Sequence, residues 1–140
     1  MNRDHLKTGL RWLLTLFVVT AGVSHFTDPA PFVGMVPAAL PAPLLLVYVS
    51  GAAEIAGGLG LILPQTRRLA AWGLIALFVA VFPANVNMAV NHLPLGTKVV
   101  APALLWARLP LQALLIAWAY WYTRASAPRA AQPAAACARA

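Results

Sequence analysis

Long apolar segments separated by short polar or proline-rich connections dominate the sequence. The apolar segments cover residues 12–26, 43–63, 69–91 and 103–122. Residues 43–63, wound as a helix, would extend about 30 Å, which is the thickness of the hydrocarbon core of a bilayer. Pro83 lies inside the third segment, where it frees a backbone carbonyl and is expected to bend the helix. The pattern therefore predicts an all-α fold, an integral membrane bundle of four transmembrane helices.

The connections and the end of the chain have compositions of their own. Five prolines interrupt residues 28–43, namely Pro29, Pro31, Pro37, Pro41 and Pro43, so a continuous helix is not expected there. Phe32 and Met35 are too apolar for a solvated loop, so we expect an interfacial or re-entrant segment over the outer end of the bundle, with both side chains turned inward. Residues 125–140 are rich in Ala and Pro and are predicted to be a disordered cytoplasmic tail, which leaves residues 1–124 as one membrane domain.

Composition and charge agree with a membrane protein. The chain is 61% hydrophobic and 9% charged, whereas soluble domains have about 25% charged residues. Eight basic residues lie on one side of the predicted membrane, namely Arg3, Lys7, Arg11, Arg67, Arg68, Arg124, Arg129 and Arg139. The connections on the other side contain a single Lys or Arg, Lys98. This positive-inside bias predicts that both termini are cytoplasmic, and it accounts for the net charge of +7 without a nucleic-acid partner. The single cysteine, Cys137, excludes a disulfide within the chain.

Glu54 is the only carboxylate within the apolar segments. A charge near the middle of a bilayer costs at least about 2.5 kcal/mol, so Glu54 needs a proton or a partner. Ser50, Glu54 and Gly58 share one helical face, whose small residues let a neighbouring helix approach closely. Arg108 is the only basic residue within the segments, and we expect it to pair with Glu54. The pair is either a functional site or a structural link that holds two helices in register.

Further polar side chains fall in the same outer half of the predicted bundle. At 1.5 Å per residue, Asn85 and Gln112 lie about 9 and 14 Å from the outer ends of their helices, and His25 closes the first helix at the outer face. Asn85 would orient a ligand, and Gln112 would either contact the ligand or form hydrogen bonds between helices. His25 would exchange protons or bond to local backbone. His25 and His92 have no metal-specific spacing, so no metal site is predicted.

The sequence also resembles a known family. The residues that carry the resemblance are Ala21-Gly22-Val23-Ser24-His25-Phe26, the stretches 47–61 and 66–73, Phe82-Pro83-Ala84-Asn85 and Arg108-Leu109-Pro110-Leu111-Gln112. Together they resemble the DoxX family of small four-helix bacterial membrane proteins. The resemblance implies a bacterial inner-membrane protein with both ends inside. Relatives in that family include a subunit of a thiosulfate:quinone oxidoreductase and a maturation factor for methylamine dehydrogenase.

The polar cluster and the resemblance together lead to a functional hypothesis. The protein would bind a small, largely apolar molecule, such as a quinone or an isoprenoid, in a cavity open toward the outer leaflet. It would act as a subunit of a redox complex or as a lipid-modifying, isomerase-like enzyme, with a redox protein or a second copy of the chain as partner. Two alternatives stay open: an accessory or scaffold protein whose ion pair is structural, and a transporter of a small solute. The catalytic candidates are Glu54, Arg108 and His25, and the ligand-binding candidates are Asn85, Gln112 and Ser50.

Overall fold

The computed structural model describes residues 3–124, with side chains from His5 onward, and this part of the chain is all-helical. Its helices are α1 (Arg3–Thr27), α2 (Ala30–Val33), α3 (Pro43–Ile62), α4 (Arg67–Val90) and α5 (Pro102–Trp121). Four of them, all but α2, are long and apolar enough to cross a membrane. The prediction of an all-α fold with four such helices is therefore confirmed. The predicted tail, residues 125–140 with Cys137, lies outside the described residues.

The predicted helix boundaries differ from the observed ones mainly at the start of the chain. Helix α1 begins at Arg3, although its apolar segment begins at residue 12. The stretch before residue 12 contains no proline, so the helix can extend beyond the N-terminal boundary of the apolar segment. Helix α4 continues through Pro83 and α5 through Pro110, so both prolines lie within long helices.

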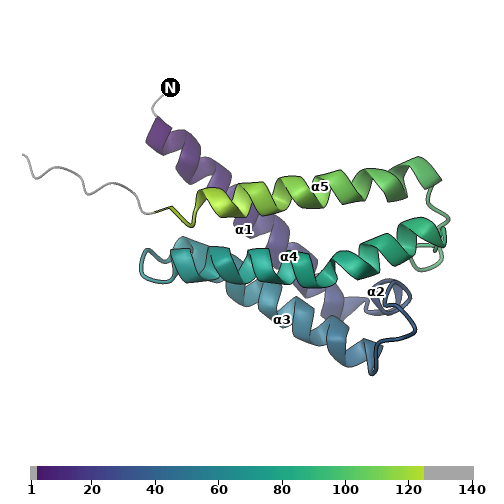
Figure 1. The fold of residues 1–140 in the computed structure, drawn as a ribbon. Helices are drawn as coiled ribbons and strands as arrows, with labels where there is room; N and C mark the ends of the chain where they lie inside the picture. Colours follow the sequence, from purple (N-terminus) through teal and green to yellow (C-terminus); the bar gives the residue numbers. More distant parts are fainter. Residues whose placement is uncertain (1–2, 125–140) are drawn as a thin grey trace, which may run out of the picture.

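The long helices pack in a chain of neighbours (Figure 1). Helix α1 packs along α3, α3 packs on α4, and α4 packs on α5. Helices α1 and α5 meet at one end of the bundle, where the hydroxyl of Tyr122 donates a 3.1 Å hydrogen bond to the Lys7 carbonyl. Toward the opposite end, where α2 lies, α1 and α5 move apart, and within the described residues they are not among the closely packed helix pairs. The bundle is thus closed at one end and wider at the other.

Two hydrophobic clusters fill the ends of the bundle. The first joins all four long helices and contains Leu14, Val18, Leu61, Ala71, Leu74, Phe78, Ala119 and Tyr122. The second lies at the end covered by α2 and contains Met35, Met88, Ala89 and Leu105. Phe78 of the first cluster and Met35 of the second both line one cavity, so this cavity lies between the two clusters.

The cover segment, residues 28–42, closes the wide end. It holds α2 and two tight turns, and its Met35 side chain is buried. The Phe32 ring lies 4.0 Å from the His25 ring, centroid to centroid. The Asn87 side chain of α4 donates a 3.0 Å hydrogen bond to the Met35 carbonyl. These contacts fix the segment to both α1 and α4.

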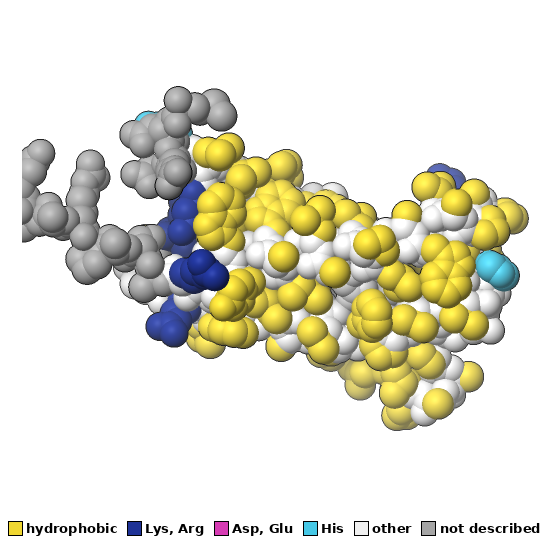
Figure 2. All heavy atoms as spheres, turned by 45° about the horizontal axis from the view of Figure 1, so that its top comes forward, with side chains coloured by type: hydrophobic (Ala, Val, Ile, Leu, Met, Phe, Trp, Pro, Cys, Tyr) yellow, Lys and Arg dark blue, Asp and Glu magenta, His cyan; other side chains and the backbone are white. Residues whose placement is uncertain are grey.

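The outer surface of the bundle is apolar along its length. Leu16, Leu69 and Leu114 are 65%, 77% and 61% exposed. Figure 2 shows hydrophobic side chains over most of the visible face and Lys and Arg side chains gathered mainly at one end. An exposed apolar surface this large is unstable in water, and it suits a hydrocarbon environment.

Candidate functional site

The site begins at a close crossing of α1 and α3. A Cβ on Gly22 would lie 2.7 Å from the Gly51 carbonyl oxygen, and a Cβ on Gly51 would lie 2.7 Å from the His25 Cβ. No real side chain tolerates such distances, so only glycine allows this approach of the two backbones. Nearby, the Thr15 hydroxyl donates a 3.1 Å hydrogen bond to the Gly58 carbonyl. The crossing therefore fixes the half of α1 nearer the cover segment against α3.

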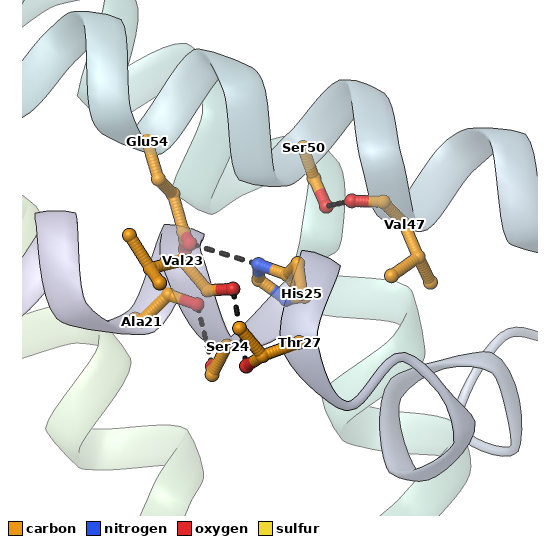
Figure 3. A network of polar contacts seen from close by, with 8 residues as sticks. All are labelled: Ala21, Val23, Ser24, His25, Thr27, Val47, Ser50 and Glu54. Carbon is orange, nitrogen blue, oxygen red and sulfur yellow. Dashed lines mark hydrogen bonds and ion pairs between the residues drawn. The ribbon is translucent and has the colours of Figure 1, made fainter.

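This crossing brings His25 of α1 next to Glu54 of α3 (Figure 3). His25 Nδ1 and Glu54 Oε2 are 3.0 Å apart, and their side chains are only 11% and 12% exposed. The distance is that of an ion pair, but the angles are not those of a hydrogen bond. Each of the two atoms therefore has no hydrogen-bond partner among the described residues. Two titratable groups thus face each other in a buried site with hydrogen-bonding capacity left over.

The expected pair of Glu54 with Arg108 is not formed. Within the described residues Arg108 has no ion pair, and its Nη1 atom donates instead to Met88 Sδ at 3.2 Å. The physical reason is the helix order: α3 packs on α1 and α4, whereas α5 packs on α4. Glu54 and Arg108 therefore lie on helices that are not direct neighbours, and His25 on the adjacent helix reaches the carboxylate first.

Asn85 and Gln112 form a second polar unit between α4 and α5. Asn85 Nδ2 donates a 2.7 Å hydrogen bond to Gln112 Oε1. Gln112 Nε2 donates to the Phe78 carbonyl on α4, and Gln112 is only 4% exposed. Both amides are thus used between helices, which the sequence had offered as one interpretation for Gln112 but not for Asn85.

All these groups line one cavity of about 400 Å³. This is within the range of about 300–1,000 Å³ typical of small-molecule sites. The six residues predicted to form the site all line it, and they are His25, Ser50, Glu54, Asn85, Arg108 and Gln112. Most of the remaining wall is apolar, including Phe17, Leu77 and Leu115. The Ser50 hydroxyl donates to the Val47 carbonyl at 2.8 Å, so it is occupied within its own helix.

Sequence reasoning missed Met88 as part of the site, as well as the pairing of His25 with Glu54. Met88 carried no polar signal, although its sulfur is the acceptor for Arg108. A signal for the pair does exist: His25 follows Gly22 by three residues, and Glu54 follows Gly51 by three residues. In this antiparallel crossing (Figure 1) His25 packs over Gly51 and Glu54 packs over Gly22, so the two glycines leave room for both side chains to meet.

The arrangement has two distinct chemical capacities. The His25–Glu54 pair can hold or exchange a proton within an apolar surrounding. The Arg108 guanidinium is half-buried, and its one hydrogen bond to the described residues goes to a weak thioether acceptor, so it can donate to an oxygen of a ligand. Within the described residues no three His, Cys, Asp or Glu side chains come together as a group that could hold a metal ion.

Comparison with known proteins places the chain by family. Residues 14–123 match the family described as "Domain of unknown function (DUF8561)". This match covers α3, α4, α5 and the second half of α1, and it includes every residue of the candidate site. No curated protein and no solved structure matches the chain.

Proposed function

The chain belongs to the DUF8561 family, and for it we propose a function that rests on the cavity: binding of a largely apolar molecule with a polar head inside the membrane. The observation that carries the proposal is the lining of the cavity. Its walls are mostly apolar, and a histidine, a carboxylate and a guanidinium converge on the same space. Intramembrane ionisable groups are costly and are functional sites by default.

A purely structural role explains the His25–Glu54 pair less well than it explains the Asn85 and Gln112 side chains. The glycine crossing and the Thr15–Gly58 hydrogen bond already hold α1 against α3. A buried ion pair adds little to a contact that is tight without it, because its desolvation cost is large. The pair is therefore better explained by a ligand or a proton than by helix packing.

In the proposed site each group has one task. Arg108 donates to a carbonyl or anionic oxygen of the head, and Asn85 and Gln112 form a fixed polar wall beside it. His25 and Glu54 hold a proton at the opposite wall and can pass it to or from the bound head. A quinone or an isoprenoid with an oxygen-bearing head suits this set of groups, either in a redox complex or in an isomerase-like enzyme. An accessory protein without catalysis and a small-solute transporter are the alternatives.

The proposal includes an orientation and a location. Both termini lie in the cytoplasm of a bacterium, the protein crosses the inner membrane, and the cover segment and the wide end of the cavity face outward. The support is the excess of Lys and Arg near the chain ends and the α3–α4 turn. The resemblance to the DoxX family belongs to this proposal as well. A cysteine placed at Gln65 should resist an impermeant thiol reagent in intact cells, and labelling there would contradict the orientation.

Native mass spectrometry of the detergent-purified protein tests the binding function. We expect the wild type to carry a bound small molecule, which Glu54→Gln and Arg108→Leu lose. The matched control is Leu69→Ala, because Leu69 is 77% exposed and does not line the cavity. A wild type that carries no more bound molecule than Glu54→Gln would overturn the proposal and favour the accessory role.

A further inference from the structure

The cavity reaches the lipid-facing surface between α1 and α5. Phe17 on α1 and Leu111 on α5 both line it, and each is 49% exposed. The two helices meet at the Tyr122–Lys7 end and separate toward α2 (Figure 1). Since the half-exposed Phe17 and Leu111 line the cavity from both helices, we take the opening between them as a lateral gap. A molecule dissolved in the bilayer can therefore reach the cavity without crossing water.

A second hollow continues from this gap along α1. It is lined by Leu13, Leu16, Phe17, Thr20, Ala21 and Ser24, and it shares Phe17 and Ala21 with the cavity. At 1.5 Å per residue, the stretch from Leu13 to Ser24 is about 16 Å long. The cavity thus has an apolar extension that leads away from its polar groups and toward the narrow end of the bundle.

The polar side chains of the cavity indicate the chemistry of the ligand's head group. Arg108 has only the Met88 sulfur as acceptor among the described residues. A guanidinium binds carboxylate or phosphate oxygens much more strongly than it binds a thioether. Its best ligand is therefore an anionic or carbonyl oxygen placed inside the cavity.

From these observations, and resting on the proposed binding function, we infer that the ligand is a long-chain amphiphile. Its oxygen-bearing head lies between Arg108 and the His25–Glu54 pair. Its chain leaves through the gap between α1 and α5 and lies along the α1 hollow. A cavity of about 400 Å³ holds a head and the start of a chain but cannot enclose a long chain, so the chain needs this exit.

Photocrosslinking tests the path of the chain. Two probes with the same ten-carbon tail and a terminal diazirine are added to the protein in nanodiscs, one with a carboxylate head and one with a benzoquinone head. We expect at least one of them to label the stretch 13–20 on α1 above the level given by the same alkane without a head. Labelling no higher than that of the headless alkane, or concentrated near Val49 on α3, would overturn the inference, since Val49 lines the cavity at another side and is 57% exposed.

Variants separate this inference from the binding function itself. Thr20→Trp fills the α1 hollow at a residue that does not line the cavity, so it should weaken binding of the labelling tailed probe about tenfold or more and leave binding of its tail-less head unchanged. The matched control is Val23→Trp, an exposed position on α1 outside both hollows. Equal losses for the tailed and tail-less molecules would overturn the exit path. If the tail-less heads bind in an Arg108-dependent manner and neither tailed probe labels α1, the binding function stands and the long-chain ligand does not.

Discussion

Gly22 and Gly51 lie against each other at the crossing of α1 and α3, and a Cβ on Gly22 would come within 2.7 Å of the Gly51 carbonyl oxygen. The proximity of His25 to Glu54 depends on this contact, because His25 packs over Gly51 and Glu54 packs over Gly22, and their side chains meet across the crossing. The contact between His25 and Glu54 therefore requires that positions 22 and 51 carry no side chain.

Replacement of Gly51 by valine should both destabilise the protein and separate the His25–Glu54 pair. Overpacking of this kind costs about 1–3 kcal/mol. Unfolding in mixed detergent micelles measures the loss. The matched control is Gly73→Val, because a Cβ at Gly73 meets nothing within 4 Å. Equal stability of the Gly51→Val and Gly73→Val proteins would contradict the close crossing.

A double-mutant cycle should show coupling between His25 and Glu54. The His25→Leu and Glu54→Leu variants remove two groups in contact, so their combined effect should differ from the sum by about 0.5–3 kcal/mol. The same cycle for Glu54 and Arg108 should be additive within about 0.5 kcal/mol, since these side chains do not form a pair in the structure. Strong coupling in the second cycle and none in the first would reverse this assignment.

Gln112→Leu should lower the free energy of unfolding by about 1–3 kcal/mol, because it leaves the Asn85 amide and the Phe78 carbonyl without their partner. Detergent unfolding checks this value. The control on the same helix is Leu114→Ala, at a position 61% exposed, and its effect should stay within about 0.5 kcal/mol. A Gln112→Leu protein as stable as this control would show that the amide pair contributes nothing to packing.

Tyr122 should make the folded protein sensitive to alkaline pH. Burial raises the pKa of the Tyr122 phenol above its ordinary value of 10.0, and the hydroxyl donates to the Lys7 carbonyl. The folded state therefore keeps its proton at a pH where the unfolded chain has lost it. The contribution of Tyr122 to stability is complete below about pH 10 and is lost as the pH rises above this value.

The measurement for Tyr122 is the unfolding free energy of the wild type and of Tyr122→Phe between pH 8 and about pH 11. The difference between the two proteins should shrink as the pH rises, and the titration of lysines cancels in it. Tyr120→Phe is the control, because Tyr120 is 44% exposed. A difference that does not change with pH would show that the phenol is not protected by burial.

The sequence was sufficient to predict α3, α4 and α5 and six residues that line one cavity, but it did not predict how these residues pair. Apolar length and proline positions give α3, α4 and α5 to within about two residues, since a bilayer sets the length of an apolar helix. The convergence of Asn85, Arg108 and Gln112 on one cavity follows from their similar depths. Depth says nothing about which helices are neighbours, and the Glu54–Arg108 error arose there. Only the chain-like packing order α1–α3–α4–α5 decides that Glu54 meets His25.

The separation of α1 from α5 at the covered end has a mechanical consequence. The helix pairs α1–α3 and α4–α5 are joined by the α3–α4 packing, by the cover segment and, at the opposite end, by the large hydrophobic cluster. The side of the bundle between α1 and α5 is therefore the one that is least held together. We expect a change in the volume of the cavity to alter the spacing of α1 and α5 before that of any other pair of long helices.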